Sequence, residues 1–133
     1  MPRDLSKLGT PRVWLTRAKS NLIRSKQPKP EEVLWEDLCF DTQQAVEKAL
    51  KAVLLARGIS FRFVHDIAEL ITLLENQGII LPEEIKASAE LTDYSVESRY
   101  PGPFEPVTEE EFKKALRIAE AVVAWAESQI EQL

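Results

Sequence analysis

Prolines and glycines divide this chain into segments of helical length, and the segments carry apolar residues at helical spacing. The longest uninterrupted segment, 31–57, lies between Pro30 and Gly58 and places apolar side chains along one face of a helix. No segment alternates apolar and polar residues with the period of two that is typical of a half-buried strand. The sequence therefore predicts an all-α fold.

Capping residues predict where the helices begin and end. Thr10 followed by Pro11 is typical of a helix start, and Thr108 with Glu111 forms a capping-box pattern. We expect helices over about 11–26, 31–57, 67–77, 83–95 and 109–131, packed as an antiparallel up-and-down four-helix bundle with a short additional helix. Residues 1–9 are expected to form a flexible tail before a single helical domain, 10–133.

Composition excludes several classes of protein. A chain of 133 residues is long enough to bury one core without disulfides or metal. Its single cysteine, Cys39, and its single histidine, His65, exclude a disulfide framework and metal sites built from paired cysteines or histidines. No apolar run reaches the roughly 20 residues of a membrane helix. We expect a cytoplasmic protein with no metal, no cofactor and no membrane contact.

Charge is distributed unevenly along the chain. Residues 1–30 carry eight Lys and Arg against one Asp, whereas the remaining 103 carry nine Lys and Arg against 21 Asp and Glu. Three interpretations stay open: a basic solvent face on the first helix, a basic edge that meets a polyanion or partner, or complementarity between the two parts of the chain.

The last helix carries more apolar surface than one bundle core needs. Its main apolar stripe includes Phe112, Leu116 and Val123. A second set of side chains widens this stripe to nearly half the circumference: Ile118, Val122 and Trp125. We expect these three residues to form the interface of a homodimer.

A mixed face of the second helix combines amide, charged and apolar side chains. Glu47 and Lys51 lie four residues apart there, beside Lys48. One interpretation is a surface ion pair, which contributes about 0.3–0.5 kcal/mol. In the other, a lysine binds a phosphate group while Glu47 orients an arginine.

The sequence resembles the HEPN (higher eukaryotes and prokaryotes nucleotide-binding) domain family over about residues 10–130. The resemblance rests on segment 40–51, FDTQQAVEKALK, and on Gly58, His65-Asp66, Asp93-Tyr94 and Arg99-Tyr100-Pro101. It implies a dimeric helical bundle, often encoded beside a small nucleotidyltransferase with which it can form a two-part module. The candidate residues for binding a nucleotide or another phosphate-bearing ligand are Glu47, Lys48, Lys51, His65, Arg99 and Tyr100.

Many members of that family are ribonucleases marked by an arginine, four to six intervening residues and a histidine. The three positions that could hold this arginine before His65 are Gly58, Ile59 and Ser60. The sequence therefore resembles the branch that lacks the motif, and we assign no catalytic residue. The alternatives are an RNA-cleaving toxin component with a rearranged active site and a ligand-free dimeric adaptor.

Overall fold

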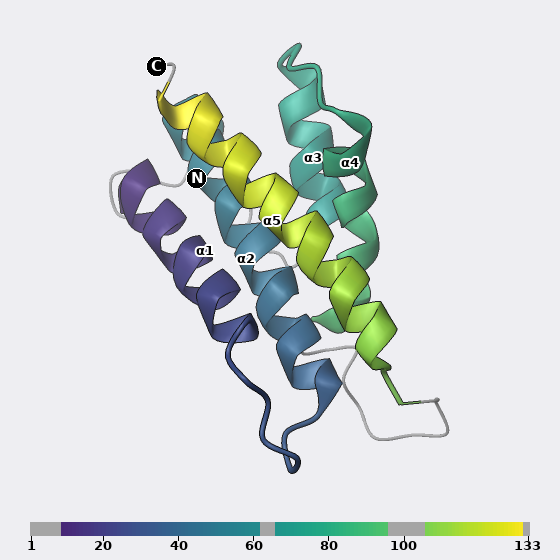
Figure 1. Cartoon of the computed structure of the whole chain (residues 1–133). Helices are drawn as coiled ribbons and strands as arrows, with labels where there is room; N and C mark the ends of the chain where they lie inside the picture. The colour runs from purple at the N-terminus through teal and green to yellow at the C-terminus, as the bar shows by residue number, and fades with distance from the viewer. Residues whose placement is uncertain (1–8, 62–65, 96–105, 132–133) are drawn as a thin grey trace.

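The computed structural model describes residues 9–61, 66–95 and 106–131, and within these ranges every regular element is helical (Figure 1). The fold is an all-α antiparallel four-helix bundle with a short additional helical segment, as the sequence predicts. The four main helices are α1 (Pro11–Ser25), α2 (Trp35–Ala56), α3 (Ile67–Asn76) and α5 (Glu109–Glu131). The additional segment comprises α4 (Glu83–Lys86) and the 3₁₀ helix η2 (Ala87–Tyr94).

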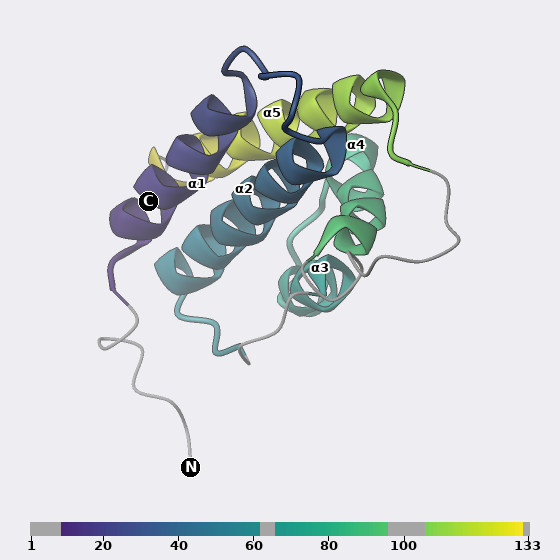
Figure 2. The ribbon, with the colours of Figure 1, turned by 90° about the horizontal axis from the view of Figure 1, so that it is seen from below.

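Helix α2 lies at the centre of the bundle. It packs against α1, α5, α3 and η2, and Figure 2 shows it between α1 and α3. Each residue of α2 is at least partly buried, the mixed face included. Apolar side chains such as Val46, Leu50 and Val53 form the middle of the core. The polar side chains of α2 therefore need partners inside the protein.

Two predicted helix starts are confirmed by their capping bonds. The Thr10 Oγ1 atom accepts a hydrogen bond from the Val13 amide at 3.1 Å, and Thr108 Oγ1 accepts one from the Glu111 amide at 3.1 Å. Each bond satisfies an amide that has no partner within its own helix. The starts of α1 and α5 therefore follow from local sequence.

Helix α2 begins four residues later than predicted, at Trp35 instead of position 31. The Asp37 carboxylate accepts the Leu34 amide at 3.3 Å and thereby caps the helix at Leu34. The Lys29 ammonium donates to the Val33 carbonyl at 2.6 Å and holds the preceding residues in a turn. The prolines indicate that the first two helices are separated by a non-helical segment. The contacts of Asp37 and Lys29 determine that this segment extends to Leu34.

The predicted α-helix over 83–95 is wrong for most of its length, because only its first turn is α-helical. The residues that point inward are Ile85, Ser88, Leu91 and Tyr94, which recur every three positions. A 3₁₀ helix has three residues per turn and keeps such a set on one face. The Ser88 hydroxyl also donates to the Ile85 carbonyl at 2.5 Å.

The expected apolar flank of α5 is largely covered within the bundle. Val122 is fully buried in the core, so its assignment to a dimer interface is wrong. Ile118 and Trp125 are partly buried and pack against the same core. Among the described residues, the large apolar side chains that are exposed lie elsewhere: Val13, Ile23, Leu34 and Ile80.

Part of the basic charge of α1 is neutralised by α5. Lys19 pairs with Glu127, and Lys26 pairs with Glu120 at 2.8 Å. The two pairs of this ladder are separated by about seven residues, which is two turns of each antiparallel helix. With the pair between Arg24 and Asp41, complementarity between the two parts of the chain therefore accounts for three of the basic residues. No helix within the described ranges is both long enough and apolar enough to cross a membrane.

Candidate functional site

The Glu47–Lys51 pair lies inside the protein, so the interpretation as a surface ion pair is wrong. The Lys51 ammonium lies 2.9 Å from the Glu47 carboxylate, and each side chain is only 4% exposed. The Gln43 side-chain amide donates to the other Glu47 oxygen at 3.1 Å. A buried ion pair of this kind is stable only when its remaining polar atoms also have partners.

Aromatic rings enclose the Lys51 ammonium. Its nitrogen lies 5.8 Å from the ring centroid of Trp14 on α1 and 5.8 Å from that of Phe61, which follows α2. Both rings are close enough for a cation–π interaction. Lys51 is therefore occupied by Glu47 and the two rings, and it does not present a free cation at the surface.

Lys48 lies on an adjacent side of α2, where it contacts Asn21 of α1. Its ammonium donates to the Asn21 carbonyl oxygen at 2.7 Å, and the Asn21 amide donates to Asp41 at 3.2 Å. The Arg24 guanidinium binds the same Asp41 carboxylate, with its Nε atom 3.0 Å from one oxygen. We call Arg17, Asn21, Arg24, Asp41 and Lys48 the α1–α2 seam.

The seam is rich in positive charge. Burial lowers the pKa of Lys48, and the positive charges of Arg17 and Arg24 lower it further, whereas Glu47 and Asp41 act in the opposite direction. The hydrogen bond from Arg24 to Asp41 raises the pKa of the guanidinium. The Arg17 guanidinium lies 5.5 Å from the Trp14 ring centroid and has no carboxylate partner among the described residues. The seam therefore holds three cations and the carboxylate of Asp41, and Glu47 adds a further negative charge beside Lys48.

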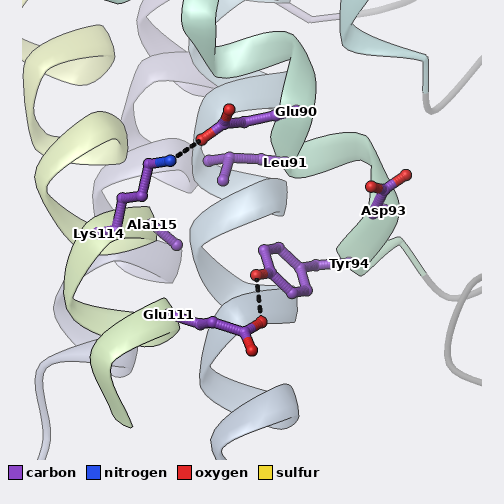
Figure 3. Close-up of a pocket in the computed structure, with 7 residues that line it drawn as sticks. All are labelled: Glu90, Leu91, Asp93, Tyr94, Glu111, Lys114 and Ala115. Carbon is purple, nitrogen blue, oxygen red and sulfur yellow. Dashed lines mark hydrogen bonds and ion pairs between the residues drawn. The ribbon is translucent and has the colours of Figure 1, made fainter. Parts of the chain in front are cut away.

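A hollow of about 310 Å³ lies between η2 and α5 and has the opposite charge (Figure 3). The Tyr94 hydroxyl donates to Glu111 at 3.0 Å, and Lys114 pairs with Glu90 at 3.2 Å. With Asp93 also in the lining, the hollow has three carboxylates and one lysine. Burial and the bond to Glu111 raise the pKa of Tyr94, so its hydroxyl stays protonated. This hollow is unsuited to a phosphate group.

Cys39 is a buried residue of the core. Burial, together with the charge of Glu111, raises the pKa of its thiol to about 12. The reactive thiolate form is therefore disfavoured at neutral pH. No cluster of potential metal ligands occurs in the part of the chain that the structure describes.

The structure separates the candidate residues that the sequence groups together. Glu47 and Lys51 form one buried pair, and Lys48 belongs to the seam. His65, Arg99 and Tyr100 lie outside the described residues. Sequence analysis missed four seam residues: Arg17, Asn21, Arg24 and Asp41. The signal for them in the sequence is a polar stripe at helical spacing on the first helix. It can be recognised as part of a site only together with the polar side chains that face it on the second helix.

Comparisons with known proteins give consistent matches over most of the chain. A family profile described as "HEPN domain" matches residues 11–129. The crystal structure of TT1696 from Thermus thermophilus is 32% identical in sequence, with a TM-score of 0.77 over 90% of this chain and 97% of that one. The crystal structure of ST0689, described as an archaeal HEPN homologue, is 27% identical, with a TM-score of 0.73 over 91% and 98% of the two chains. No curated protein matches.

Proposed function

The chain belongs to the HEPN domain family, and we propose that it is a non-catalytic member that binds a phosphate-bearing ligand, such as a nucleotide, along the α1–α2 seam. One observation carries this proposal: the half-buried Lys48 ammonium is held by Asn21 between two arginines. Burial is the main cause of the lowered pKa of Lys48, and a bound anion would offset the smaller contribution of Arg17 and Arg24.

The residues of the seam suit phosphate chemistry. Arg17 is free of carboxylates within the described ranges, and its planar guanidinium can donate two parallel bonds to one phosphate. Lys48 supplies a point charge whose position is fixed by Asn21. Charge-assisted hydrogen bonds of this kind contribute about 1.5–3 kcal/mol each. The buried Glu47–Lys51 pair is proposed to act structurally, by fixing the orientation of α2.

The proposal of a non-catalytic member rests on the residues before His65. Gly58, Ile59 and Ser60 provide no arginine at the spacing of the ribonuclease motif. Ile59 is buried, and its amide donates to the Leu54 carbonyl at 2.9 Å. This segment therefore closes helix α2 and offers no cation to a reacting phosphate.

Docking of a partner protein, such as a small nucleotidyltransferase, is the second proposed function. The observation that favours it is the exposed apolar surface of α1, where Val13 is 41% and Ile23 is 58% exposed. A partner that covered both side chains would remove their apolar surface from water.

Calorimetric titration tests ligand binding. ATP, GTP and AMP are titrated separately into the wild type, into Lys48→Met and into the control Lys113→Met, whose side chain is 53% exposed on α5. We expect at least one nucleotide to bind the wild type and the control equally, and to bind Lys48→Met at least tenfold more weakly. Equal affinity for all three proteins, or no heat with any nucleotide, would contradict binding at the seam.

A further inference from the structure

Helix α1 lies at the edge of the bundle and presents one complete face to solvent. It packs against α2 and α5 with the sides that point away from this face, at the edge of the bundle shown in Figures 1 and 2. The exposed face is formed by Val13, Thr16, Ser20 and Ile23, and Gln27 continues it just beyond the end of the helix; the five positions recur at alternating steps of three and four residues. We call these five residues the outer face of α1. This spacing is the one that a helix uses to contact a second helix along its length.

The outer face has a shape that suits a second helix. Thr16 and Ser20 are small side chains at its middle, and Ile23 projects beside them. These three residues, with Lys19, Arg24 and Gln27, line an open hollow of about 560 Å³. A large apolar side chain from a facing helix would fit over Thr16 and Ser20, in the manner of a knob entering a hole.

Both flanks of the outer face are basic. Arg17 and Arg24 lie along one side, and Arg12, Lys19 and Lys26 lie along the other, each set at intervals of seven residues. Helix α1 itself contains no acidic residue. In a pair of helices, these flanking positions determine which partner is accepted, because they face the flanking positions of the other helix.

We infer that the outer face of α1 docks an acidic amphipathic helix of a different polypeptide. The inference deepens the docking function proposed above and is independent of nucleotide binding. A second copy of α1 would bring like charges together along both flanks, which is unfavourable. The exposed side chains of Val13 and Ile23 favour a protein over a nucleic acid, since a phosphate backbone gains nothing from apolar groups.

Arg12 is the flanking cation on which we expect the preference for an acidic partner helix to depend most. Lys19, Lys26 and Arg24 already pair with carboxylates of this chain. Arg12, like Arg17, has no carboxylate partner within the described ranges. Because Arg17 also belongs to the α1–α2 seam, Arg12 and Ile23 are the positions that separate docking from ligand binding.

A designed helical peptide provides the probe. It carries leucine along one stripe and glutamate at both flanks, and a control peptide carries lysine at the same flanks. In fluorescence anisotropy, we expect the acidic peptide to bind the wild type and the lysine peptide not to bind. Ile23→Glu and Arg12→Glu should each weaken binding at least tenfold. The matched control Ile80→Glu changes an apolar residue that is 92% exposed outside α1, and it should leave binding unchanged.

Three results would overturn the inference. They are no binding of the acidic peptide, equal binding by Ile23→Glu, and binding of a 15-nucleotide RNA that depends on Arg12 but not on Ile23. Circular dichroism of the variants confirms that they are folded. Lys48→Met separates this inference from the proposed ligand site, because it should weaken nucleotide binding and leave peptide binding unchanged. A wild type that binds nucleotide but not the peptide would overturn the docking inference alone.

Discussion

The Lys51 ammonium and the Glu47 carboxylate, one helical turn apart and 2.9 Å from each other, are both withdrawn from solvent at the centre of the bundle. Their mutual contact converts two charges that would each be costly to bury into a tolerated pair. The same helix carries Lys48 on an adjacent side, where the charge is only partly compensated. Neighbouring residues of one motif thus have different physical roles.

Removal of one member of the buried pair should destabilise the fold strongly. Lys51→Met removes the cation of a buried ion pair and leaves the Glu47 carboxylate inside the protein, and we expect a loss of about 3–5 kcal/mol in the free energy of unfolding, measured with urea. The double variant Glu47→Leu/Lys51→Met should recover most of that loss. The exposed pair Glu109–Lys113 has the same spacing and is the control, so Lys113→Met should change stability by less than about 0.5 kcal/mol. A double variant as unstable as the single one would contradict this account.

Lys48 should make the stability of the protein depend on pH. Its pKa in the folded protein lies below the ordinary value of 10.5, so the unfolded chain binds more protons between these two values. The contribution of Lys48 to stability therefore rises with pH across this window and is least favourable below it. Urea unfolding of the wild type and Lys48→Met between pH 7 and about pH 10 measures the difference. Parallel stability curves for the two proteins would show that the pKa is not lowered.

Cys39 should be inert in the folded protein. Its thiol is buried and its pKa is raised to about 12. A thiol reagent therefore cannot reach the sulfur, and the sulfur is not in the reactive thiolate form. We expect no labelling by a disulfide-exchange reagent at pH 8 within the time needed to label the protein completely in urea. Rapid labelling of the native protein would place the thiol at the surface instead.

Homodimer formation remains a prediction. Ile118 and Trp125 are the members of the proposed interface that keep some exposure, and they belong to the same face of α5. Light scattering during size-exclusion chromatography at micromolar concentration should give twice the 15.1 kDa mass of one chain. Trp125→Glu should shift the equilibrium toward the monomer, and Ile80→Glu should not. A monomeric mass at every concentration would contradict the prediction.

The purified protein should not cleave RNA. Gly58, Ile59 and Ser60 leave His65 without an arginine at the required spacing, so the cation with which the motif would stabilise the transition state is missing from its position. A generic RNA incubated without metal and analysed by electrophoresis provides the measurement. Cleavage that His65→Ala abolishes would favour the toxin alternative.

Local signals in the sequence predicted most of the fold. Thr10 and Thr108 cap their helices as expected, because a cap depends on residues only three positions away. The 3₁₀ helix carried a signal that could have been used, since Ser88 and Leu91 repeat with a period of three. The site was less predictable. The burial of Lys51 depends on Trp14 and Phe61, and no pattern within α2 shows which residues cover it.

The ladder between α1 and α5 has a mechanical consequence. Lys19 faces Glu127 and Lys26 faces Glu120, so the first residues of α1 and the last residues of α5 lie at the same end of the bundle. Force applied to these two helix ends would load the ion pairs one after another, beginning with Lys19–Glu127. Helices loaded in this way separate by unzipping at low force, whereas a parallel arrangement would load both pairs together in shear. In optical-trap pulling, α1 and α5 should therefore separate from each other first, and the central helix α2 should be exposed only after that step.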